Sequence, residues 1–555
     1  MPRQSKTKDL HKIAQERFGY DRLHPGQIAA LQSILDGHDT LAVMPTGAGK
    51  SAIYQMAAYL MPGATVIVSP LVALQQDQVD SIARHNVGEA ALVNSTLKTC
   101  EREAAFAELE AGDLEFLFLA PEQFSNPETL DRLQAVQPSL FVIDEAHCIS
   151  EWGHDFRPDY LRLNCIIHAL GQPRILALTA TAAPPVRSEI VERLEMKNPK
   201  TIVQGFDRPN ICLSVMRFED DSEKQDSLIR WVSQAEKPGI VYVATRKRAE
   251  AIAQILQVQG VNAIFYHGGM KGDDRHQAQT QFMEDQATVI VATTAFGMGV
   301  DKANVRFVAH YDISASIDSY YQEIGRAGRD GEPAKALLFY NPADLNLRRF
   351  FASGGQIDAE SVATVIDLVQ QDEDGAIAKR SRNGIDAKEL AEETDLSKSK
   401  IKTALNRLSD VGVVEASATG GFVAADDAPE KGEAIAAALD AQERRSHFER
   451  SRLEMMRGYA EVRNCRRQYL LNYFGEDYPQ LCENCDNCKA GISRENTSDY
   501  QPFPLNDRVT HKEWGKGLVM RYEDDKIVVL FDQVGYKTLE TKRSVLFRLL
   551  TRVDQ

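Results

Sequence analysis

The sequence predicts an α/β protein in which two parallel β-sheets follow each other and smaller units come after them. Between Leu41 and about residue 205, short apolar runs alternate with amphipathic stretches, a pattern typical of buried parallel strands joined by crossover helices. The pattern restarts at residue 239 and stops near residue 345. A chain of 555 residues is also too long for one hydrophobic core, which favours several domains.

Each half of this α/β region contains five apolar runs that we expect to form a doubly wound sheet. Two such units in tandem leave a cleft between them, in which both units can hold one ligand. The expected strands of the first unit lie at 41–44, 65–70, 114–121, 140–145 and 175–181, and those of the second unit at 239–245, 263–266, 288–294, 305–312 and 334–340.

After the second unit the strand–helix alternation is lost. The helical spacing of Leu390, Ile401, Leu405 and Leu408, followed by two β-prone pieces around a Gly-Gly turn, predicts a helix–turn–helix with a wing. An arginine-rich helical stretch follows, and short alternating strands near the end of the chain predict a small β-barrel. The expected domains are 1–205 and 206–345 for the two α/β lobes, 357–428 for the winged-helix-like segment, 441–492 for a helical cysteine-containing module and 503–555 for the barrel.

The composition is that of an ordinary globular protein, with 43% hydrophobic and 26% charged residues. No stretch approaches the roughly 20 apolar residues that would span a membrane, and the first residues lack the apolar core of a signal peptide, so we expect a cytoplasmic protein without membrane contact. The formal net charge of −16 argues against a surface that is basic all over. Nucleic-acid binding would therefore need a local basic track.

A glycine-containing loop, MPTGAGKS at residues 44–51, follows the first apolar run and precedes a helical stretch. Such a loop aims backbone N–H groups and the positive end of the helix dipole at phosphate oxygens. Lys50 would reach the β- and γ-phosphates of ATP, and the Ser51 hydroxyl would ligate Mg²⁺. The strict motif has glycine where this chain has Met44, and a chance loop is the alternative. The expected nucleotide-binding residues of the loop are Thr46, Gly47, Gly49, Lys50 and Ser51.

Paired acids end another apolar run, LFVIDEAH at residues 140–147. Asp144 can hold Mg²⁺ through water, while Glu145 can orient and deprotonate the attacking water. The alternative is an acidic N-cap at a strand-to-helix turn, which the phosphate loop upstream disfavours.

In the second unit, QEIGRAGRDG at residues 322–331 contains two arginines that could act on the same nucleotide. Arg326 and Arg329 are three residues apart, so on a helix both could face the cleft. There they could stabilise charge that develops on the γ-phosphate, as arginine fingers do. Surface arginines are the alternative, which the two-lobed arrangement disfavours.

These motifs and their neighbours resemble the RecQ family of superfamily 2 helicases. The resemblance runs from about Phe18 to Tyr340 and resumes at a C-terminal cysteine cluster. It implies two RecA-like lobes and ATP-driven, 3′-to-5′ unwinding of DNA. The matching stretches are FGYDRLHPGQ (18–27), MPTGAGKS (44–51), SPLVALQQDQV (69–79), DEAHCISEWGHDFRPDY (144–160), LTATA (178–182), FDRPNI (206–211), VATTAFGMGVDKANVRFV (291–308) and YYQEIGRAGRDG (320–331).

The resemblance also implies roles for residues outside the phosphate loop. Tyr20 would stack on adenine and Gln27 would hydrogen-bond to it, and the family usually has an arginine where this chain has His24. The threonines of LTATA would couple the two lobes. Gln322 would sense the γ-phosphate or its attacking water.

SEWGHDFRPDY, residues 150–160, matches the aromatic-rich loop that couples DNA binding to ATP hydrolysis in this family. Trp152 and Phe156 could stack on unpaired bases, whereas His154 and Arg157 offer donors to phosphate or to the ATPase site. Core anchoring by the two aromatic rings is the alternative.

Four cysteines lie close together near the end of the chain: Cys465, Cys482, Cys485 and Cys488. In a reducing compartment, clustered cysteines are more often metal ligands than disulfides. The stretch 464–490 resembles the zinc module of the family, with Cys465 on a helix and three ligands from CxxCxxC. Four thiolates around Zn²⁺ would make a closed, structural site. Buried free thiols are the alternative.

The chain departs from the family after the two lobes. In typical members a winged helix follows the zinc module, whereas here the winged-helix-like segment precedes it. The family's strand-separating hairpin is therefore not carried over, and a wing at 413–424, with Phe422, leaves that role open. The tail at 506–539 resembles the Tudor-like module of UvrD-type helicases, which is linked to docking on RNA polymerase. We expect a protein partner, RNA polymerase or a repair factor; a barrel that binds DNA or only caps the fold is the alternative.

Arginines accumulate before and within the cysteine module, and they are the best candidates for a local DNA track. A solvated helix face with ion pairs four residues apart is the alternative. The arginines are Arg444, Arg445, Arg450, Arg452, Arg457, Arg463, Arg466 and Arg467.

Taken together, these features predict a DNA-stimulated ATPase that moves along single-stranded DNA and unwinds duplex DNA in repair or recombination, with ATP, Mg²⁺ and structural Zn²⁺ as cofactors. An RNA helicase is a second interpretation, because DEAH also occurs in that class; the aromatic loop and the cysteine module disfavour it. A non-enzymatic scaffold protein is a third, which intact Lys50, Asp144 and Glu145 disfavour.

Overall fold

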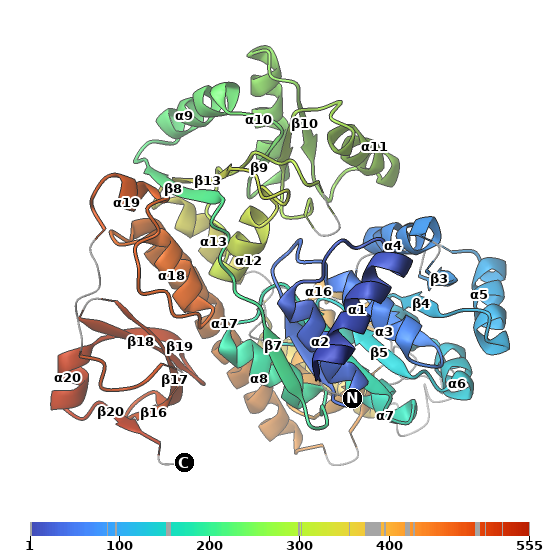
Figure 1. Ribbon diagram of the computed structural model, residues 1–555. Coiled ribbons are helices and arrows are strands. Elements are labelled where there is room, and N and C mark those ends of the chain that lie inside the picture. Colours follow the sequence, from blue (N-terminus) through green and yellow to red (C-terminus); the bar gives the residue numbers. More distant parts are fainter. Residues whose placement is uncertain are drawn as a thin grey trace.

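The computed structural model contains two α/β lobes, the first coloured blue to cyan and the second green, with the C-terminal units in orange and red beside them (Figure 1). Within the described residues, no helix is both long and apolar enough to cross a membrane. The structure describes residues 3–70, 72–85, 87–94, 97–150, 157–297, 300, 302–353, 356–371, 390–392, 394, 396–416, 422–425, 428–493, 500–505, 507–523 and 525–553.

The first lobe is a parallel sheet of seven strands in the order β3-β4-β2-β5-β6-β1-β7. The inner strands β2, β4 and β5 are buried along their whole length, as their continuous apolar sequences predict. The strands are β1 (Thr40–Val43), β2 (Thr65–Val68), β3 (Ala90–Val93), β4 (Phe116–Leu119), β5 (Leu140–Ile143), β6 (Arg174–Thr179) and β7 (Lys200–Val203).

Helices connect these strands, and helices α1 and α2 precede them. The helices are α1 (Arg3–Phe18), α2 (Pro25–Leu35), α3 (Lys50–Leu60), α4 (Val72–His85), α5 (Thr99–Ala111), α6 (Pro127–Val136), α7 (Leu163–Ala169) and α8 (Pro184–Arg193), with the short 3₁₀ helices η1 (Pro121–Ser125), η2 (Ala146–Ile149) and η3 (Pro158–Tyr160).

The second lobe repeats this plan with six parallel strands in the order β10-β11-β9-β12-β13-β8. At Gly239 a side chain has no room, because an added Cβ would lie 2.0 Å from the Phe307 ring on the neighbouring strand. The elements are β8 (Ile211–Arg217), α9 (Asp221–Gln234), β9 (Gly239–Tyr242), α10 (Arg246–Val258), β10 (Ala263–Tyr266), α11 (Gly272–Met283), β11 (Val289–Ala292), β12 (Phe307–His310), α12 (Ile317–Ile324), β13 (Ala334–Tyr340) and α13 (Asp344–Ser353).

Three edge strands, β3, β7 and β8, were not among the ten expected from the sequence. An edge strand is covered by a neighbour on one side only, so it does not need a continuous apolar run. The residues of β7 are mostly exposed, and those of β8 alternate between buried and half-buried before ending exposed. The α/β class and the two parallel sheets are confirmed. Only the edge strands β3, β7 and β8 were not predicted.

A helical unit with a short hairpin follows the second lobe. Its helices α14 (Ala359–Gln371) and α16 (Lys398–Asp410) pack together, and β14 (Val414–Ala416) pairs antiparallel with β15 (Phe422–Ala424). Ile401, Leu405 and Leu408 are buried in its core, as the helical spacing predicts.

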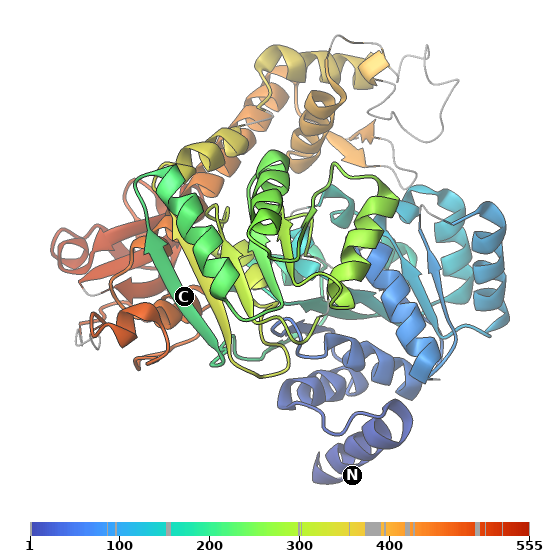
Figure 2. The ribbon, with the colours of Figure 1, turned by 90° about the horizontal axis from the view of Figure 1, so that it is seen from above.

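The long helix α17 (Lys431–Glu461) joins this unit to the remaining units. Its 31 residues span about 46 Å at a rise of about 1.5 Å per residue. Ala434 and Ala438, near its start, are buried in the core of this helical unit. Its second half packs on α12 and α13 of the second lobe and on the C-terminal barrel (Figures 1 and 2). We call α17, α18 (Arg466–Tyr473) and α19 (Asp486–Lys489) the spine.

The C-terminal unit, which we call the barrel after the sequence expectation, contains a five-stranded antiparallel sheet in the order β19-β18-β17-β16-β20. One face docks on the spine: Arg521 is fully buried, with its guanidinium 4.2 Å from the centroid of the Tyr469 ring. Its elements are β16 (Arg508–His511), β17 (Gly515–Glu523), β18 (Lys526–Phe531), β19 (Gly535–Glu540), α20 (Thr541–Leu546) and β20 (Leu550–Arg552).

Candidate active site

One cavity of about 160 Å³ collects the predicted chemistry from both lobes. It lies at the carboxyl ends of β1 and β5, the edge at which open parallel sheets bind ligands. The lobes meet there at van der Waals range: a Cβ added to Gly47 would lie 3.4 Å from Cγ of Arg329. Residues predicted from the sequence that line this cavity are Thr46, Gly47, Gly49, Lys50, Ser51, Asp144, Glu145, Gln322, Arg326 and Arg329.

The phosphate loop connects β1 to α3 and needs its glycines. Gly47 and Gly49 have φ angles of 84° and 68°, in the left-handed region that side chains disfavour. A Cβ on Gly49 would also lie 2.7 Å from Nε2 of Gln27. Lys50, the first residue of α3, donates from Nζ to the Met44 carbonyl at 3.4 Å, so the loop curls around its ammonium group.

The two acids stand directly after β5. Asp144 accepts a hydrogen bond from the Glu145 backbone N–H at 3.0 Å, and its own carbonyl accepts one from the Tyr160 hydroxyl at 3.0 Å. Burial and then the charge of Glu145 raise the pKa of Asp144 to about 6, although Lys50 opposes this shift. Two adjacent, partly desolvated carboxylates beside a phosphate loop suit a divalent cation, which would compensate their charge.

Glu145 adopts a left-handed conformation, with φ 50° and ψ 46°. This conformation is costly for a residue with a side chain and persists only where the surroundings impose it. Its carboxylate lies 3.3 Å from Nδ1 of His147, which also contacts Oγ1 of Thr179 at 2.9 Å. Thr179 in turn donates to the carbonyl of Thr181 at 3.1 Å. The DEAH and LTATA motifs are therefore joined through His147, a residue that the sequence analysis did not single out.

The two arginines reach the cavity from a turn, whereas the sequence analysis expected a helix. Helix α12 ends at Ile324, and Gly328 has a φ angle of 56°, so the chain coils tightly through this segment. Arg326 is buried, and Arg329 donates from Nη1 to the Val300 carbonyl at 2.9 Å. Both arginines line the cavity, but the segment that carries them is a turn and not a helix, because glycines interrupt it.

Two residues of the FDRPNI motif hold this turn, and the sequence analysis gave them no role. Arg208 donates to the carbonyls of Gly325, Ala327 and Gly328 at 3.1, 2.9 and 2.9 Å. Asn210 donates to the carbonyl of Gly328 at 2.8 Å. Because one side chain donates to three carbonyls of the same turn, it fixes the path of the backbone through that turn. The position of FDRPNI between the two lobes was the feature of the sequence that could have predicted this role.

The residues expected to bind adenine, Tyr20, His24 and Gln27, are not among those that line this cavity. Tyr20 stacks on Phe18, with ring centroids 6.0 Å apart, and donates to Gln55 at 2.9 Å. Gln27 is tied to the phosphate loop: Nε2 donates to the carbonyls of Ala48 and Gly49 at 3.1 and 2.8 Å, and Oε1 accepts from the backbone of His24 at 2.7 Å. His24 itself is exposed at the start of α2.

Of the predicted DNA-coupling loop, Trp152, His154 and Phe156 lie outside the described residues. Arg157 is half-buried and anchors the end of the loop. Its backbone N–H donates to the Cys148 carbonyl at 2.9 Å, and Nη1 donates to the Pro70 carbonyl at 3.2 Å. Arg157 thus lies directly beside the DEAH segment.

The expected basic track is not supported, because most of its arginines are neutralised. Along α17, acids one turn away pair with Arg444, Arg445 and Arg457. Such pairs leave little net charge for phosphates.

Three further arginines of the track are buried in ion pairs with acids of other elements. Arg452 pairs with Asp318, Arg466 with Asp486 and Arg467 with Asp207. The pairs of Arg452 and Arg467 fasten the spine to α12 and to the linker between the lobes, and the pair of Arg466 joins α18 to α19 within the spine, so all three serve packing.

The four cysteines form a compact group. Their Sγ atoms all lie within 4.8 Å of one another, and those of Cys482 and Cys488 are 3.9 Å apart. A tetrahedral zinc with Zn–S bonds of about 2.3 Å separates its sulfurs by about 3.8 Å, so the group fits Zn²⁺. Cys465 is the N-cap of α18 and precedes the helix, so the expectation that it lies on a helix is wrong by one position.

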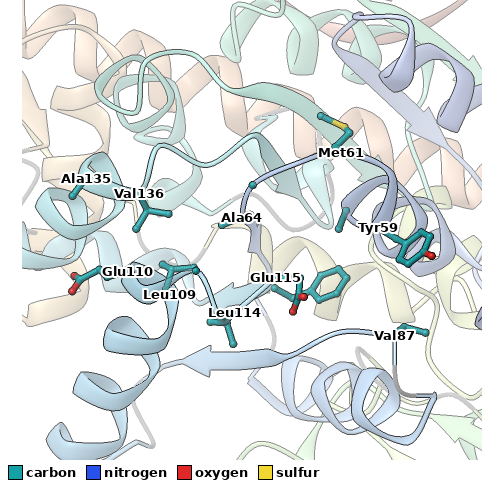
Figure 3. Close-up of a pocket in the computed structure, with 14 residues that line it drawn as sticks. Tyr59, Met61, Ala64, Val87, Leu109, Glu110, Leu114, Glu115, Ala135 and Val136 are labelled. Atoms are coloured by element: carbon teal, nitrogen blue, oxygen red, sulfur yellow. The ribbon is translucent and has the colours of Figure 1, made fainter.

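A larger cavity, of about 630 Å³, lies at the opposite, amino-terminal edge of the first sheet (Figure 3). Its lining includes Tyr59, Met61, Leu114 and Glu115, and none of the residues that the sequence analysis singled out. Since ligands of open parallel sheets bind at the carboxyl edge, this cavity does not compete as the active site.

The fold and the cavity define a two-lobed nucleotide hydrolase of the helicase type. Models of three families match the chain: DEAD/DEAH box helicase at residues 24–189, helicase conserved C-terminal domain at 223–331 and RecQ zinc-binding at 426–489.

Curated relatives agree with these matches. The chain is 42% identical over 366 residues to a probable ATP-dependent DNA helicase RecS of Bacillus subtilis (strain 168), covering 66% of this chain and 73% of that protein. It is 41% identical over 336 residues to the ATP-dependent DNA helicase RecQ of Pasteurella multocida (strain Pm70), covering 60% of this chain and 52% of the relative. The chain belongs to the RecQ family of ATP-dependent DNA helicases, and it spans about half the length of some of its relatives.

Among solved structures, a crystal structure of the DUF1998 helicase MrfA bound to DNA is similar, with a TM-score of 0.52 at 17% identity. It covers 78% of this chain and 61% of that chain. At this identity the similarity supports the fold alone.

Proposed function

We propose that this protein is an ATP-driven DNA helicase that moves 3′ to 5′ along single-stranded DNA and unwinds duplexes in DNA repair or recombination. The observation that carries the proposal is the convergence of Lys50, Asp144 and Glu145 of the first lobe with Arg326 and Arg329 of the second in one cavity. A site divided between two lobes changes when the lobes move, and hydrolysis can thereby drive movement along a strand.

In this proposal the first lobe binds ATP and Mg²⁺ and activates the attacking water. Lys50 and the backbone of the phosphate loop hold the β- and γ-phosphates, and Ser51 and Asp144 hold Mg²⁺, which would shield the phosphate charge. Glu145 orients the attacking water and accepts its proton. Its contact with His147 at 3.3 Å supports this role, because it restrains the carboxylate near the lobe interface.

The second lobe supplies positive charge and a sensor. Arg326 and Arg329 stabilise the negative charge that develops as the γ-phosphate is transferred, and Gln322 responds to the γ-phosphate or its water. Tyr20, Gln27 and His24 serve the adenine; the bonds from Gln27 to the loop carbonyls at 3.1 and 2.8 Å link base recognition to the phosphate loop.

Strand displacement tests the whole proposal. Duplexes with 3′ tails, with 5′ tails and made of RNA are compared in the presence of ATP and Mg²⁺, with Lys50→Ala as the control. We expect displacement from the 3′-tailed DNA and none by the control variant. Displacement from only the 5′-tailed DNA would refute the polarity, and displacement from only RNA would favour the RNA-helicase alternative.

We propose that DNA is sensed by the loop with Trp152 and Phe156, through base stacking. The support is the anchor at Arg157, which ties the end of this loop to Cys148 beside the DEAH segment. Trp152→Ala should reduce the stimulation of ATP hydrolysis by single-stranded DNA while the basal rate stays within about twofold. Equal loss of both rates would contradict a coupling role.

We propose a protein partner for the barrel, with RNA polymerase as the first candidate and a repair factor as the second. Helix α20 stands at the outer edge of the barrel (Figure 1), and Leu546 and Phe547 there are 76% and 60% exposed. Exposed adjacent apolar side chains suit a protein interface. Leu546→Asp should weaken binding to purified RNA polymerase, whereas Val258→Asp on the second lobe, 84% exposed, should not. Equal binding by both variants would exclude this surface.

A further inference from the structure

The position of helix α12 sets where Gln322, Arg326 and Arg329 lie in the cavity. It has only eight residues, carries Gln322 and leads directly into the turn with Arg326 and Arg329. A short helix has few contacts with which to hold its register, so the residues that anchor it control the groups at its end.

Two anchors of α12 come from the second lobe and the linker. Glu323 accepts hydrogen bonds from His310 at 2.7 Å and from Ser314 at 2.8 Å. Tyr321 donates from its hydroxyl to the Phe206 carbonyl at 2.6 Å. These contacts hold α12 against the second lobe and the linker.

A further anchor comes from the spine, more than a hundred residues further along the chain. Asp318, one helical turn before Gln322, accepts a hydrogen bond from the Tyr473 hydroxyl at 2.6 Å. Nη2 of Arg452 lies 3.5 Å from the same carboxylate oxygen. All three side chains are buried, so Asp318 has no solvent to replace a lost donor.

The barrel supports this anchor. Tyr536 of β19 packs on the ring of Tyr473, with centroids 5.6 Å apart. The barrel face is held close to α17 at Gly535, where an added Cβ would lie 2.2 Å from Oγ of Ser451. A continuous buried path therefore leads from the barrel through Tyr473 and Asp318 to the helix that carries Gln322.

We propose that Asp318, held by Tyr473, is a positioning residue for Gln322 and Arg326, and that the barrel is part of this positioning apparatus through Tyr536. The proposal rests on the ATPase function proposed above. Groups that stabilise developing charge must be placed to within a fraction of an ångström, and a shift of about 1 Å can cost about 100-fold in rate. A barrel that braces α12 thus acts on hydrolysis without touching the nucleotide.

Removal of one hydroxyl tests the anchor in the full-length protein. Tyr473→Phe deletes the donor to Asp318 and preserves the ring. The matched control is Tyr340→Phe, since the Tyr340 hydroxyl donates to Glu461 of α17 at 2.8 Å and not to a residue of α12. We expect kcat for DNA-stimulated ATP hydrolysis to fall about tenfold in Tyr473→Phe, with KM for ATP within about twofold, and to stay within about twofold in the control.

A purely structural role would affect the two variants alike. Similar losses of kcat in both, or an unchanged kcat in Tyr473→Phe at a reduced melting temperature, would overturn the positioning role. If Lys50→Ala retained hydrolysis, the proposed function would fail instead, so the two failures are distinguishable.

A second pair of variants tests the barrel. Tyr536→Leu loosens the contact with Tyr473, whereas Tyr522→Phe removes a hydroxyl whose partners, the backbone N–H and carbonyl of Phe503, lie within the barrel region. We expect Tyr536→Leu to lower kcat at least about threefold and Tyr522→Phe to leave it within about twofold. Equal values of kcat in Tyr536→Leu and Tyr522→Phe would contradict a role of the barrel in positioning α12.

Discussion

Replacement of Arg208 by alanine should impair catalysis more than stability. Arg208 holds the turn that carries Arg326 and Arg329 through three hydrogen bonds of 2.9 to 3.1 Å to backbone carbonyls. Each such bond is worth about 0.5–1.5 kcal/mol net, so the three together are worth about 1.5–4.5 kcal/mol. If about 3 kcal/mol of this serves to place the two arginines, its loss lowers kcat by about 100-fold.

The assay is steady-state ATP hydrolysis at saturating single-stranded DNA. KM for ATP should change less than about threefold, because the arginines act mainly on charge that develops during the reaction. The control is Arg187→Ala, since Arg187 is also half-buried and donates to the carbonyls of Ala182 and Phe474 at 2.8 and 2.7 Å but does not contact the turn. Equal losses of kcat in the two variants, or a raised KM with normal kcat, would refute the reasoning.

Three further predictions concern the nucleotide, the metal and pH. Lys50→Ala should abolish DNA-stimulated ATP hydrolysis, measured by phosphate release, while binding of labelled single-stranded DNA stays within about threefold; normal hydrolysis would remove the site assignment. The purified protein should contain about one zinc per chain by metal analysis, and Cys485→Ser should lose it and melt at a lower temperature; retained zinc would exclude Cys485 as a ligand. Burial by itself raises the pKa of Glu323, but the hydrogen bonds from His310 and Ser314 and the charge of His310 outweigh it and hold the pKa below its usual range. The charged form therefore stabilises the fold above about pH 4.5, and this contribution is lost as the pH falls through the lowered pKa. Glu323→Gln should reduce the free energy of unfolding at pH 7 and converge with the parent protein as the pH falls through the lowered pKa of Glu323; a constant difference would contradict the shift.

Much of the candidate site follows from local sequence because each motif is a local structure. A buried strand that ends in a glycine-containing loop and then a helix places Lys50 at a helix N-terminus wherever the sheet lies. A strand that is followed directly by Asp144 and Glu145 places both acids at the same edge. The rule that parallel strands share their carboxyl edge then predicts their meeting, which the cavity shows.

The path of the chain around the two arginines could not be read in the same way. Spacing three apart favoured a helix, but the segment is a coiled turn stabilised by Arg208, which lies 117 residues or more before its acceptors. Local spacing does not contain the position of a side chain from the linker, so this part of the site depended on the fold.

The charge on the spine shows the same limit. Eight arginines in a short stretch looked like a DNA track, yet Arg467 pairs with Asp207, which is 260 residues away, and Arg452 pairs with Asp318. Whether a charge is available to a ligand depends on its partner, and the partner here comes from another domain.

The sequence by itself determined the α/β class, the catalytic motifs and the four clustered cysteines, because backbone periodicity and short-range spacing are properties of neighbouring residues. Only the tertiary structure decided how the arginine turn is held, which arginines are neutralised and how the barrel braces α12 through Tyr473 and Asp318. Those features arise from contacts between segments far apart in the chain, and such contacts form only when the domains pack and water is excluded from between them.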